Sequence, residues 1–229
     1  KKRKHINTTD LMIEINGIIS TYVEIQHTPS IMREEPRRFD ISAIDFDLLR
    51  REFAKVKKKN LVMHDLEEVI RQKLDRMLFT NPDRINYYER YQAIIEAYNS
   101  EQDRATIEKT FMDLMDLANQ MNAEEQRYAR EGFSSDEELS LYDMLFREDL
   151  SKNDIKKLKE VAADLFQKIK AKISELDHWT DKQETKAAID NLIRDTLWAE
   201  LPECYDELSI SMYRQRIYEY VYTRYQSVA

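Results

Sequence analysis

The stretch SKNDIKKLKEVAADLFQKIKAKISELD, residues 151–177, decides the fold class of this chain. An α-helix turns by about 100° per residue, so residues three and four apart share a face. The apolar residues of the stretch keep that spacing and form one narrow stripe: Ile155, Leu158, Ala162, Leu165, Ile169, Ile173 and Leu176. The stripe predicts an amphipathic helix that packs on a hydrophobic core.

Signals for the start of a helix occur here and elsewhere in the chain. A Ser, Thr or Asn oxygen can accept a hydrogen bond from a free backbone N–H of the first turn, and an acid or amide three residues later returns one. Proline suits the first helical position. These signals are Ser42 to Asp45, Asn81-Pro82, Ser100 to Asp103, Ser134 to Glu137, Ser151 to Asp154 and Thr180 to Gln183.

The composition extends the helical prediction to the whole chain. The 229 residues include two glycines, Gly17 and Gly132, with 35% charged and 42% hydrophobic residues. So few glycines disfavour tight turns and exclude a glycine-rich loop that could hold phosphate. Near the end, Tyr213, Ile217 and Val221 step by four and favour a helix over a strand. We expect an all-α fold, an irregular multi-helix assembly with its own hydrophobic core and few or no strands.

Two regions interrupt the helical pattern. Residues 27–40 contain Pro29 and Pro36 without helical periodicity, and a second break lies near Thr80-Asn81-Pro82. The second break predicts two domains. Residues 1–80 would form the end of a helical connecting domain, and residues 81–229 a C-terminal all-helical domain.

The expected setting is the cytoplasm. Cys204 is the single cysteine, so no internal disulfide can form, and the sequence has no secretory signal pattern. The longest mostly apolar run, residues 11–25, is too polar and too short to cross a bilayer. Because the chain opens on Lys1-Lys2-Arg3-Lys4 without methionine, we expect it to be part of a longer polypeptide.

Charge is distributed unevenly along the chain. Residues 1–59 carry 13 basic and 9 acidic side chains, a net charge of +4, whereas residues 101–149 carry 5 and 14, a net charge of −9. Lysines can contact DNA phosphates without reading sequence, although they are also the ordinary solvated face of helices. The candidates for DNA contact are Lys1, Lys2, Arg3, Lys4, Lys57, Lys58, Lys59, Lys152, Lys156, Lys159 and Lys170.

Three patterns resemble catalytic sites, and none predicts one. The Glu-x-x-His pairs at residues 24–27 and 175–178 lie at expected helix ends, whereas di-iron proteins place such pairs inside a bundle core. Asp177 with Glu184-x-Lys186 lacks the strands that nuclease magnesium sites use. Acidic neighbours of Cys204 disfavour a reactive thiolate. No catalytic, metal-binding or cofactor-binding residue is predicted, and a metal-dependent helical enzyme is the remote alternative.

Aromatic residues are the second class of candidates. Large aromatic side chains fill cores, and they also anchor partner surfaces. The candidates for a partner interface are Trp179, Trp198, Tyr218 and Tyr222.

Several short motifs follow one another in a specific order. They are Asp45-Phe46-x-x-Leu49 with Phe53, Asn81-Pro82-x-Arg84, Tyr91 with Ile94-Ile95 and Tyr98-Asn99, Glu124-Glu125-Gln126-Arg127, Arg130-Glu131-Gly132, Tyr142-Asp143-x-Leu145, Trp179 and Leu201-Pro202. Over roughly residues 40–225 this order resembles the C-terminal part of the restriction, or motor, subunit of type I restriction enzymes. The type IC branch is the most similar.

The resemblance implies a function for the fragment and for the chain it belongs to. In that family one chain carries a nuclease domain, two RecA-like ATPase lobes that pump DNA, and a helical C-terminal region that attaches the motor to the methyltransferase core. The full-length chain would be a type I site-specific deoxyribonuclease with ATPase activity, and ATP and magnesium would bind upstream. This fragment would be non-catalytic.

The resemblance also implies partners. We expect the methyltransferase (modification) subunit, the assembled restriction-modification complex and double-stranded DNA bound without sequence specificity, and no membrane. The alternative is a helical protein-interaction module that makes no DNA contact.

Overall fold

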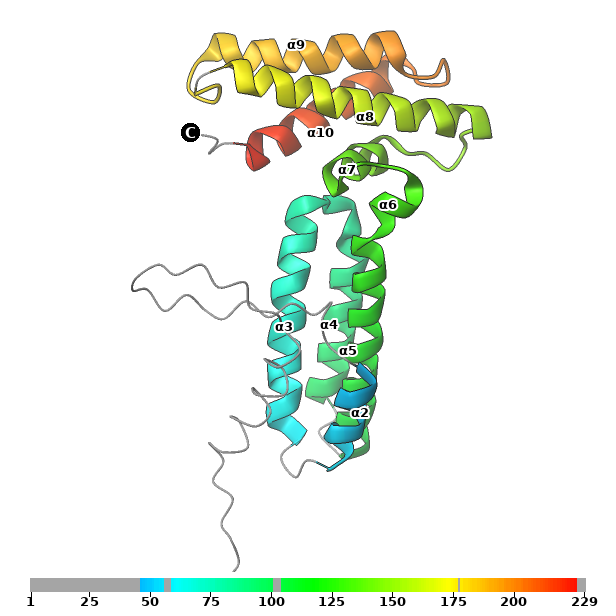
Figure 1. Cartoon of the computed structure of the whole chain (residues 1–229), viewed down its shortest axis with the longest axis vertical. Coiled ribbons are helices and arrows are strands. Elements are labelled where there is room, and N and C mark those ends of the chain that lie inside the picture. The colour runs from blue at the N-terminus through cyan, green and yellow to red at the C-terminus, as the bar shows by residue number, and fades with distance from the viewer. Residues whose placement is uncertain (1–45, 56–58, 101–103, 177, 226–229) are drawn as a thin grey trace, which may run out of the picture. The chain divides into compact units, whose positions relative to one another are not determined.

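The computed structural model describes residues 46–55, 59–100, 104–176 and 178–225. These ranges form nine α-helices and one short 3₁₀ helix, without a strand (Figure 1). The elements are α2 (Phe46–Lys55), α3 (Lys59–Thr80), η2 (Pro82–Arg84), α4 (Ile85–Ser100), α5 (Arg104–Glu125), α6 (Arg127–Glu131), α7 (Asp136–Leu145), α8 (Lys152–Glu175), α9 (Gln183–Glu200) and α10 (Glu207–Arg224). The prediction of an all-α fold is confirmed.

The chain divides into two compact units. Unit 1 comprises Lys1–Leu74 and Tyr87–Asn122, and unit 2 comprises Asp75–Asn86 and Ala123–Ala229. The three boundaries fall inside α3, α4 and α5, so each of these helices contributes residues to both units. The break predicted between residues 80 and 81 falls within unit 2, at the end of α3, and the predicted assignment of domains stays a prediction.

Unit 1 has a core of large apolar side chains. Its members with 1% exposure or less are Ile70, Leu74, Phe111, Leu114, Met115, Leu117, Ala118 and Met121. The Phe53 ring of α2 stacks on the Phe111 ring with centroids 3.6 Å apart. Lys73 is also buried, and its Nζ donates to Asn122 Oδ1 at 2.5 Å, which compensates the ammonium for lost water.

Unit 2 is built around its three longest helices. α8, α9 and α10 are successive neighbours, and α7 packs against both α8 and α10 (Figure 1). Fully buried side chains from all four helices form one cluster that includes Leu139, Leu141, Leu158, Leu165, Ile189, Ile193, Leu197 and Ile217. This cluster is the core that the stripe of residues 151–177 predicts.

The predicted faces of α8 and α10 are largely confirmed. On α8, Leu158, Ala162, Leu165, Ile169 and Ile173 are buried, and Ile155 and Leu176 lie at the edge of the core. On α10, Tyr213, Ile217 and Val221 are buried and Tyr225 lies at the edge. The C-terminal tyrosine-rich segment is therefore a helix, as predicted.

Two of the predicted helix starts are confirmed. Ser151 Oγ accepts from the Asp154 N–H, and Asp154 returns the bond to the Ser151 N–H, which completes a capping box at α8. Asn81 Oδ1 accepts from the Asp83 N–H at 3.1 Å with Pro82 in the first position, and the turn that it caps is η2.

Two other predicted starts are wrong. α7 is capped by Ser135 rather than Ser134, because the Ser135 hydroxyl accepts from the Glu138 N–H. α9 follows Lys182, which makes no side-chain cap, and the Thr180 signal starts no helix. The signals at residues 42–45 and 100–103 fall mostly outside the described residues.

No helix among the described residues combines the length and the apolar character needed to cross a membrane.

Candidate functional site

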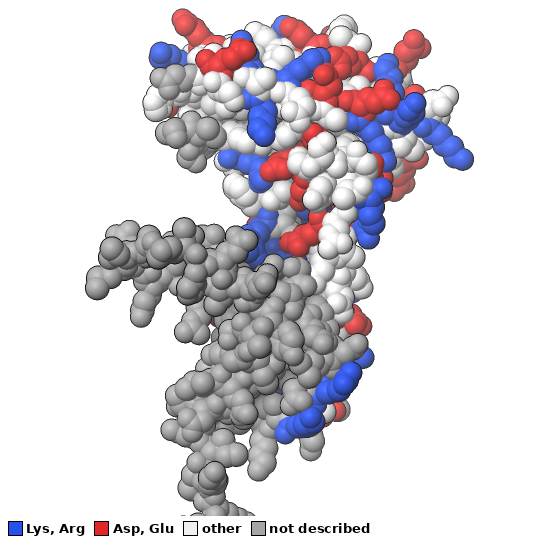
Figure 2. Space-filling model, viewed as in Figure 1, with Lys and Arg blue, Asp and Glu red and all other residues white. Residues whose placement is uncertain are grey.

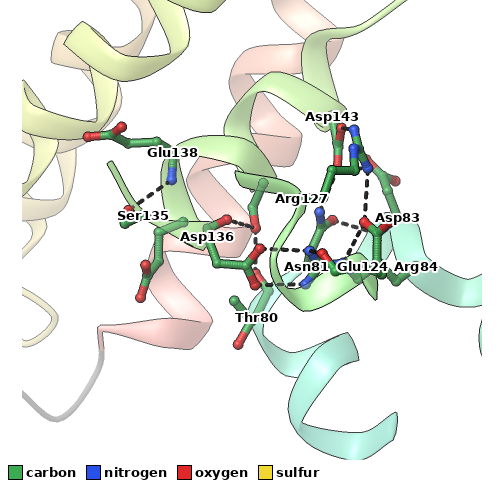
Figure 3. Close-up of polar contacts among 12 residues, drawn as sticks. Thr80, Asn81, Asp83, Arg84, Glu124, Arg127, Ser135, Asp136, Glu138 and Asp143 are labelled. Carbon is green, nitrogen blue, oxygen red and sulfur yellow. Dashed lines mark hydrogen bonds and ion pairs between the residues drawn. The ribbon is translucent and has the colours of Figure 1, made fainter. Parts of the chain in front are cut away.

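The most connected polar feature of unit 2 is a partly buried charge network around η2. It joins the turn between α3 and α4 to the end of α5, to α6 and to α7 (Figure 3). We define the charge network as Asn81, Arg84, Glu124, Arg127, Asp136 and Asp143. All six residues belong to unit 2.

Arg84 lies at the centre of the charge network and is 3% exposed. Its Nη1 and Nη2 donate to the two carboxylate oxygens of Asp136 at 2.7 and 2.6 Å. Its Nε donates to Glu124 Oε1 at 3.1 Å, and Nη2 also reaches the Glu124 carbonyl at 3.4 Å. A guanidinium fork matches such paired oxygens, which a lysine ammonium cannot do.

Arg127 forms the second half of the charge network. Its Nη1 donates to Glu124 Oε1 at 3.0 Å and to Asp143 Oδ2 at 3.2 Å, and its Nη2 donates to Asp143 Oδ1. Asn81 Nδ2 donates to Asp143 Oδ2 at 2.7 Å. Glu124 therefore bridges two arginines, and the cap of η2 is tied to α7.

α10 reaches the same turn through its polar side chains. The Tyr220 hydroxyl donates to the Thr80 carbonyl at 2.9 Å, and the Ser140 hydroxyl of α7 donates to the same carbonyl at 2.8 Å. Arg224 donates to the Phe79 carbonyl at 3.1 Å and to Glu137 Oε1 at 2.9 Å. The last carbonyls of α3, which lack partners within their own helix, are satisfied in this way.

The electrostatics of the charge network follow from burial and pairing. Burial alone would lower the pKa of the Arg84 guanidinium, but the hydrogen bonds and charges of Asp136 and Glu124 raise it above its ordinary value. Burial raises the pKa of the Asp143 carboxyl, against the opposing effects of Arg127 and Asn81. Each carboxylate of the network accepts a hydrogen bond from an arginine.

The charge network includes part of the acidic segment 101–149. Glu124, Asp136 and Asp143 supply three of its acids, and they are paired within unit 2 with Arg84 and Arg127. The sequence does not indicate the partners of Arg84, because Glu124 and Asp136 lie 40 and 52 residues away along the chain. One feature of the sequence could have indicated the network. The motifs that carry the family resemblance contain five of its six members: Asn81, Arg84, Glu124, Arg127 and Asp143.

The predicted lysines fall into three groups. Lys1, Lys2, Arg3, Lys4, Lys57 and Lys58 lie outside the described residues. Lys59 pairs with Glu108 and lies 5.2 Å from the centroid of the Phe53 ring. Lys152, Lys156 and Lys170 are exposed on α8, and basic side chains project at the end where α8 begins (Figure 2).

Lys159 differs from the other lysines of α8. Its Nζ donates to the Glu131 carbonyl at 2.9 Å and to Glu131 Oε2 at 2.7 Å, and it lies 5.8 Å from the ring centroids of Phe133 and Tyr142. This ammonium is held by α6 and α7. Contact between Lys159 and a phosphate would have to compete with those bonds.

The predicted aromatic residues separate into core and surface. Trp179 is 3% exposed, its ring meets those of Tyr218 and Tyr222 edge to face, and its Nε1 donates to the Tyr225 carbonyl at 3.1 Å. Tyr218 and Tyr222 are half-buried beside it. Trp198, in contrast, is 61% exposed near the end of α9.

The residues of the catalytic-like patterns are not brought together where they are described. Glu24, His27 and Asp177 lie outside the described residues. Glu175 pairs with Lys172 at the end of α8, and His178 is exposed with a φ of 48°. Cys204 is exposed. In the part of the chain that the structure describes, no group of three or more His, Cys, Asp or Glu side chains could hold a metal ion.

Comparison with known protein families gives one match. Residues 1–206 match the family described as "Type I restriction enzyme HindI endonuclease subunit-like, C-terminal". No curated protein and no solved structure matches the chain.

Proposed function

The chain belongs to the type I restriction enzyme HindI endonuclease subunit-like C-terminal family, and from this membership we propose that it docks the endonuclease subunit on its methyltransferase core. In this proposal the chain is a non-catalytic part of a subunit that translocates and cleaves DNA with ATP. The nuclease and ATP-binding parts, with their magnesium, belong to the upstream chain. The partner is the methyltransferase (modification) subunit within the assembled complex.

One observation carries the proposal. Five motif residues that carry the family resemblance, Asn81, Arg84, Glu124, Arg127 and Asp143, direct their polar groups at one another. Residues used in this way fix the relative positions of the helices that bear them, and they leave recognition to the outer surface. A rigid unit of this kind suits an assembly region, because a preorganised interface loses less entropy when it binds.

A docking region must also withstand load. A motor that pulls on DNA exerts force against the DNA-bound core, so the attachment has to hold during each step. Large buried apolar anchors with a charged rim provide stable protein interfaces. Unit 2 can hold such anchors in fixed positions, because α7, α8, α9 and α10 share one core.

We also propose that exposed lysines of α8 contact DNA phosphates. Lys152, Lys156 and Lys170 project from one sector of the helix and are exposed. Lys156 lies 4.0 Å from Glu160, and both side chains are mostly solvated, so this pair holds the lysine weakly. Lysines of this kind add affinity without reading sequence.

The docking test is direct binding of the purified chain to immobilised methyltransferase core. Saturable binding with a dissociation constant in the micromolar range or tighter supports the proposal. A circular dichroism spectrum typical of helices shows that the sample is folded. Absence of binding by folded protein at 100 µM would contradict the proposal.

The DNA test compares two lysines of unit 2 under the same change of charge. Lys156→Glu should weaken binding to a random duplex, whereas Lys182→Glu, at an exposed residue before α9, should change it little. Three phosphate contacts give a slope of about −2.7 for log K against log salt. Binding of the methyltransferase core without any DNA contribution would favour the interaction module that makes no DNA contact.

A further inference from the structure

Large apolar side chains are exposed unevenly over the described residues. Those more than 40% exposed are Phe79, Ile85, Phe146, Trp198, Leu208 and Met212, and all belong to unit 2. Single exposed apolar residues are common on protein surfaces, but neighbouring ones indicate a contact surface. Trp198 lies in the last turn of α9, and Leu208 and Met212 lie in the first two turns of α10, the next helix along the chain; we call these three residues the end patch.

The geometry of α9 and α10 brings the end patch to one end of the unit. The two helices are neighbours, and residues 201–206 connect the end of α9 to the start of α10 (Figure 1). Trp198 lies in the last turn of α9, and Leu208 lies in the first turn of α10. Leu208 and Met212 are four residues apart on one helix, so their side chains are neighbours.

α10 is apolar on two faces at its start. One face carries Ile210, Tyr213 and Ile217 into the core. Leu208 and Met212 lie on the opposite side and are 80% and 58% exposed. Two apolar residues on the side away from the core form a surface that the core does not cover. The end patch is therefore an uncovered face.

The charge around the end patch selects the kind of cover. Residues 198–212 contain four acidic residues, Glu200, Glu203, Asp206 and Glu207, and no basic one. Lys168 pairs with Glu200, while Glu203, Asp206 and Glu207 are exposed. Arg147 reaches the Cys204 carbonyl at 3.2 Å, but its charge is paired with Asp149. Exposed Lys157 donates to the Leu201 carbonyl at 3.4 Å, so one lysine lies beside three exposed acids and the local charge is still negative.

We propose that the end patch binds a basic, apolar-faced segment of the methyltransferase core. This inference rests on the proposed docking function and names the surface that performs it. Apolar side chains of the segment would cover Trp198, Leu208 and Met212, and its lysines or arginines would face Glu203, Asp206 and Glu207. Such complementarity fixes the register of an interface and speeds association.

Other occupants fit the end patch less well. DNA phosphates would be repelled by the acidic rim. A second copy of the chain, docked through the same patch about a twofold axis, would bring one acidic rim against another. The membrane-interface helices that bury apolar faces are usually rich in lysine and arginine, which residues 198–212 lack.

The test uses the full chain and the purified methyltransferase core as the probe. Leu208→Glu combined with Met212→Glu should raise the dissociation constant at least tenfold. Ile85→Glu is the matched control, because Ile85 is an exposed apolar residue in the first turn of α4. Leu208 and Ile85 lie in first turns, where a glutamate suits the helix dipole, and Met212 is an exposed position where a polar side chain is tolerated, so both variants should fold.

A second variant tests the charge of the occupant. Glu203→Lys combined with Glu207→Lys should weaken binding to the methyltransferase core severalfold. If the patch contacted DNA instead, the same change would strengthen binding to DNA and overturn the proposal. Wild-type binding that survives the Leu208 and Met212 changes within twofold would overturn the end patch while leaving docking intact. Failure of the wild-type chain to bind would overturn both, and wild-type dimers that the same changes dissolve would assign the patch to a second copy.

Discussion

Arg84 shows how much one buried residue organises in this fold. Its guanidinium donates to both carboxylate oxygens of Asp136 and to one carboxylate oxygen of Glu124. The residue is only 3% exposed. From the sequence alone, Asn81-Pro82-x-Arg84 could be read as a helix start, and the Asn81 cap is confirmed. The partners of Arg84 could not be predicted, because burial and pairing of a charge depend on segments 40 and 52 residues away.

The first prediction concerns Arg84→Ala. Removing one partner of a buried ion pair leaves the other charges without compensation, and such changes cost about 3 kcal/mol. The free energy of unfolding, measured with urea, should fall by about that amount. Arg130→Ala is the control. Exposed Arg130 donates to the Ala123 carbonyl, so its removal should change the free energy of unfolding little. A loss below about 1 kcal/mol for Arg84→Ala would show that the charge network contributes little.

The second prediction concerns Tyr220 and alkaline pH. Burial raises the pKa of Tyr220 from 10.0 to about 12, because the phenolate would be desolvated. The folded state therefore holds this proton more tightly than the unfolded state. The resulting stability is complete below pH 10 and is lost as the pH rises towards 12.

Urea unfolding of Tyr220→Phe at several pH values checks this reasoning. At pH 8 the variant should lose about 1 kcal/mol through the hydrogen bond to the Thr80 carbonyl. Between pH 10 and 11 its stability should fall less steeply than that of the wild type. Equal slopes would mean that Tyr220 ionises as easily in the folded state as in the unfolded one.

At the scale of elements, helical periodicity was the reliable signal and the exact helix start was not. The stripe on α8 and the four-residue steps on α10 are both buried as predicted. Ser134 and Ser135 are adjacent and both can cap, so the choice between them depends on the local backbone. Near Thr180 the buried Trp179 carbonyl accepts from the Thr185 hydroxyl, and the helix begins later, at Gln183.

The third prediction concerns the capping box of α8. Ser151→Ala removes the hydroxyl that accepts from the Asp154 N–H, and loss of such a cap costs about 1 kcal/mol. Ser174→Ala on the same helix should be neutral or slightly stabilising, because exposed Ser174 bonds back to the Lys170 carbonyl and alanine favours helices. Urea unfolding of both variants gives the comparison. If Ser151→Ala is as stable as the wild type, the capping box contributes nothing to the stability of the fold.

At the scale of the whole molecule, composition predicted the fold class, and the order of motifs predicted the family. Both are confirmed, by the helices of the described residues and by the match over residues 1–206. The surfaces that contact partners are harder to predict from the sequence. Trp198 is exposed whereas Trp179 is buried, and Lys156 is exposed whereas Lys159 is bonded to Glu131. These differences depend on how the helices pack, which the residue type alone does not reveal.

The two units also could not be read from the sequence. Their boundaries lie inside α3, α4 and α5, where helical periodicity continues without a break. The charge network sits close to these boundaries along the chain, at residues 81–84 and 124–127. We expect its loss to affect docking through the stability of unit 2, which the unfolding measurements on Arg84→Ala would reveal beforehand.

The measurement that tests the docking claim most directly is a competition. Methyltransferase core, labelled full-length endonuclease subunit of the same system and increasing amounts of this chain are mixed, and the labelled complex is followed by sedimentation velocity. We expect the chain to displace the labelled subunit once its concentration exceeds its own dissociation constant, raised by the factor that the labelled subunit's concentration and affinity set. A complex that stays intact at a hundredfold excess of folded chain would contradict the claim and place the attachment elsewhere in the subunit.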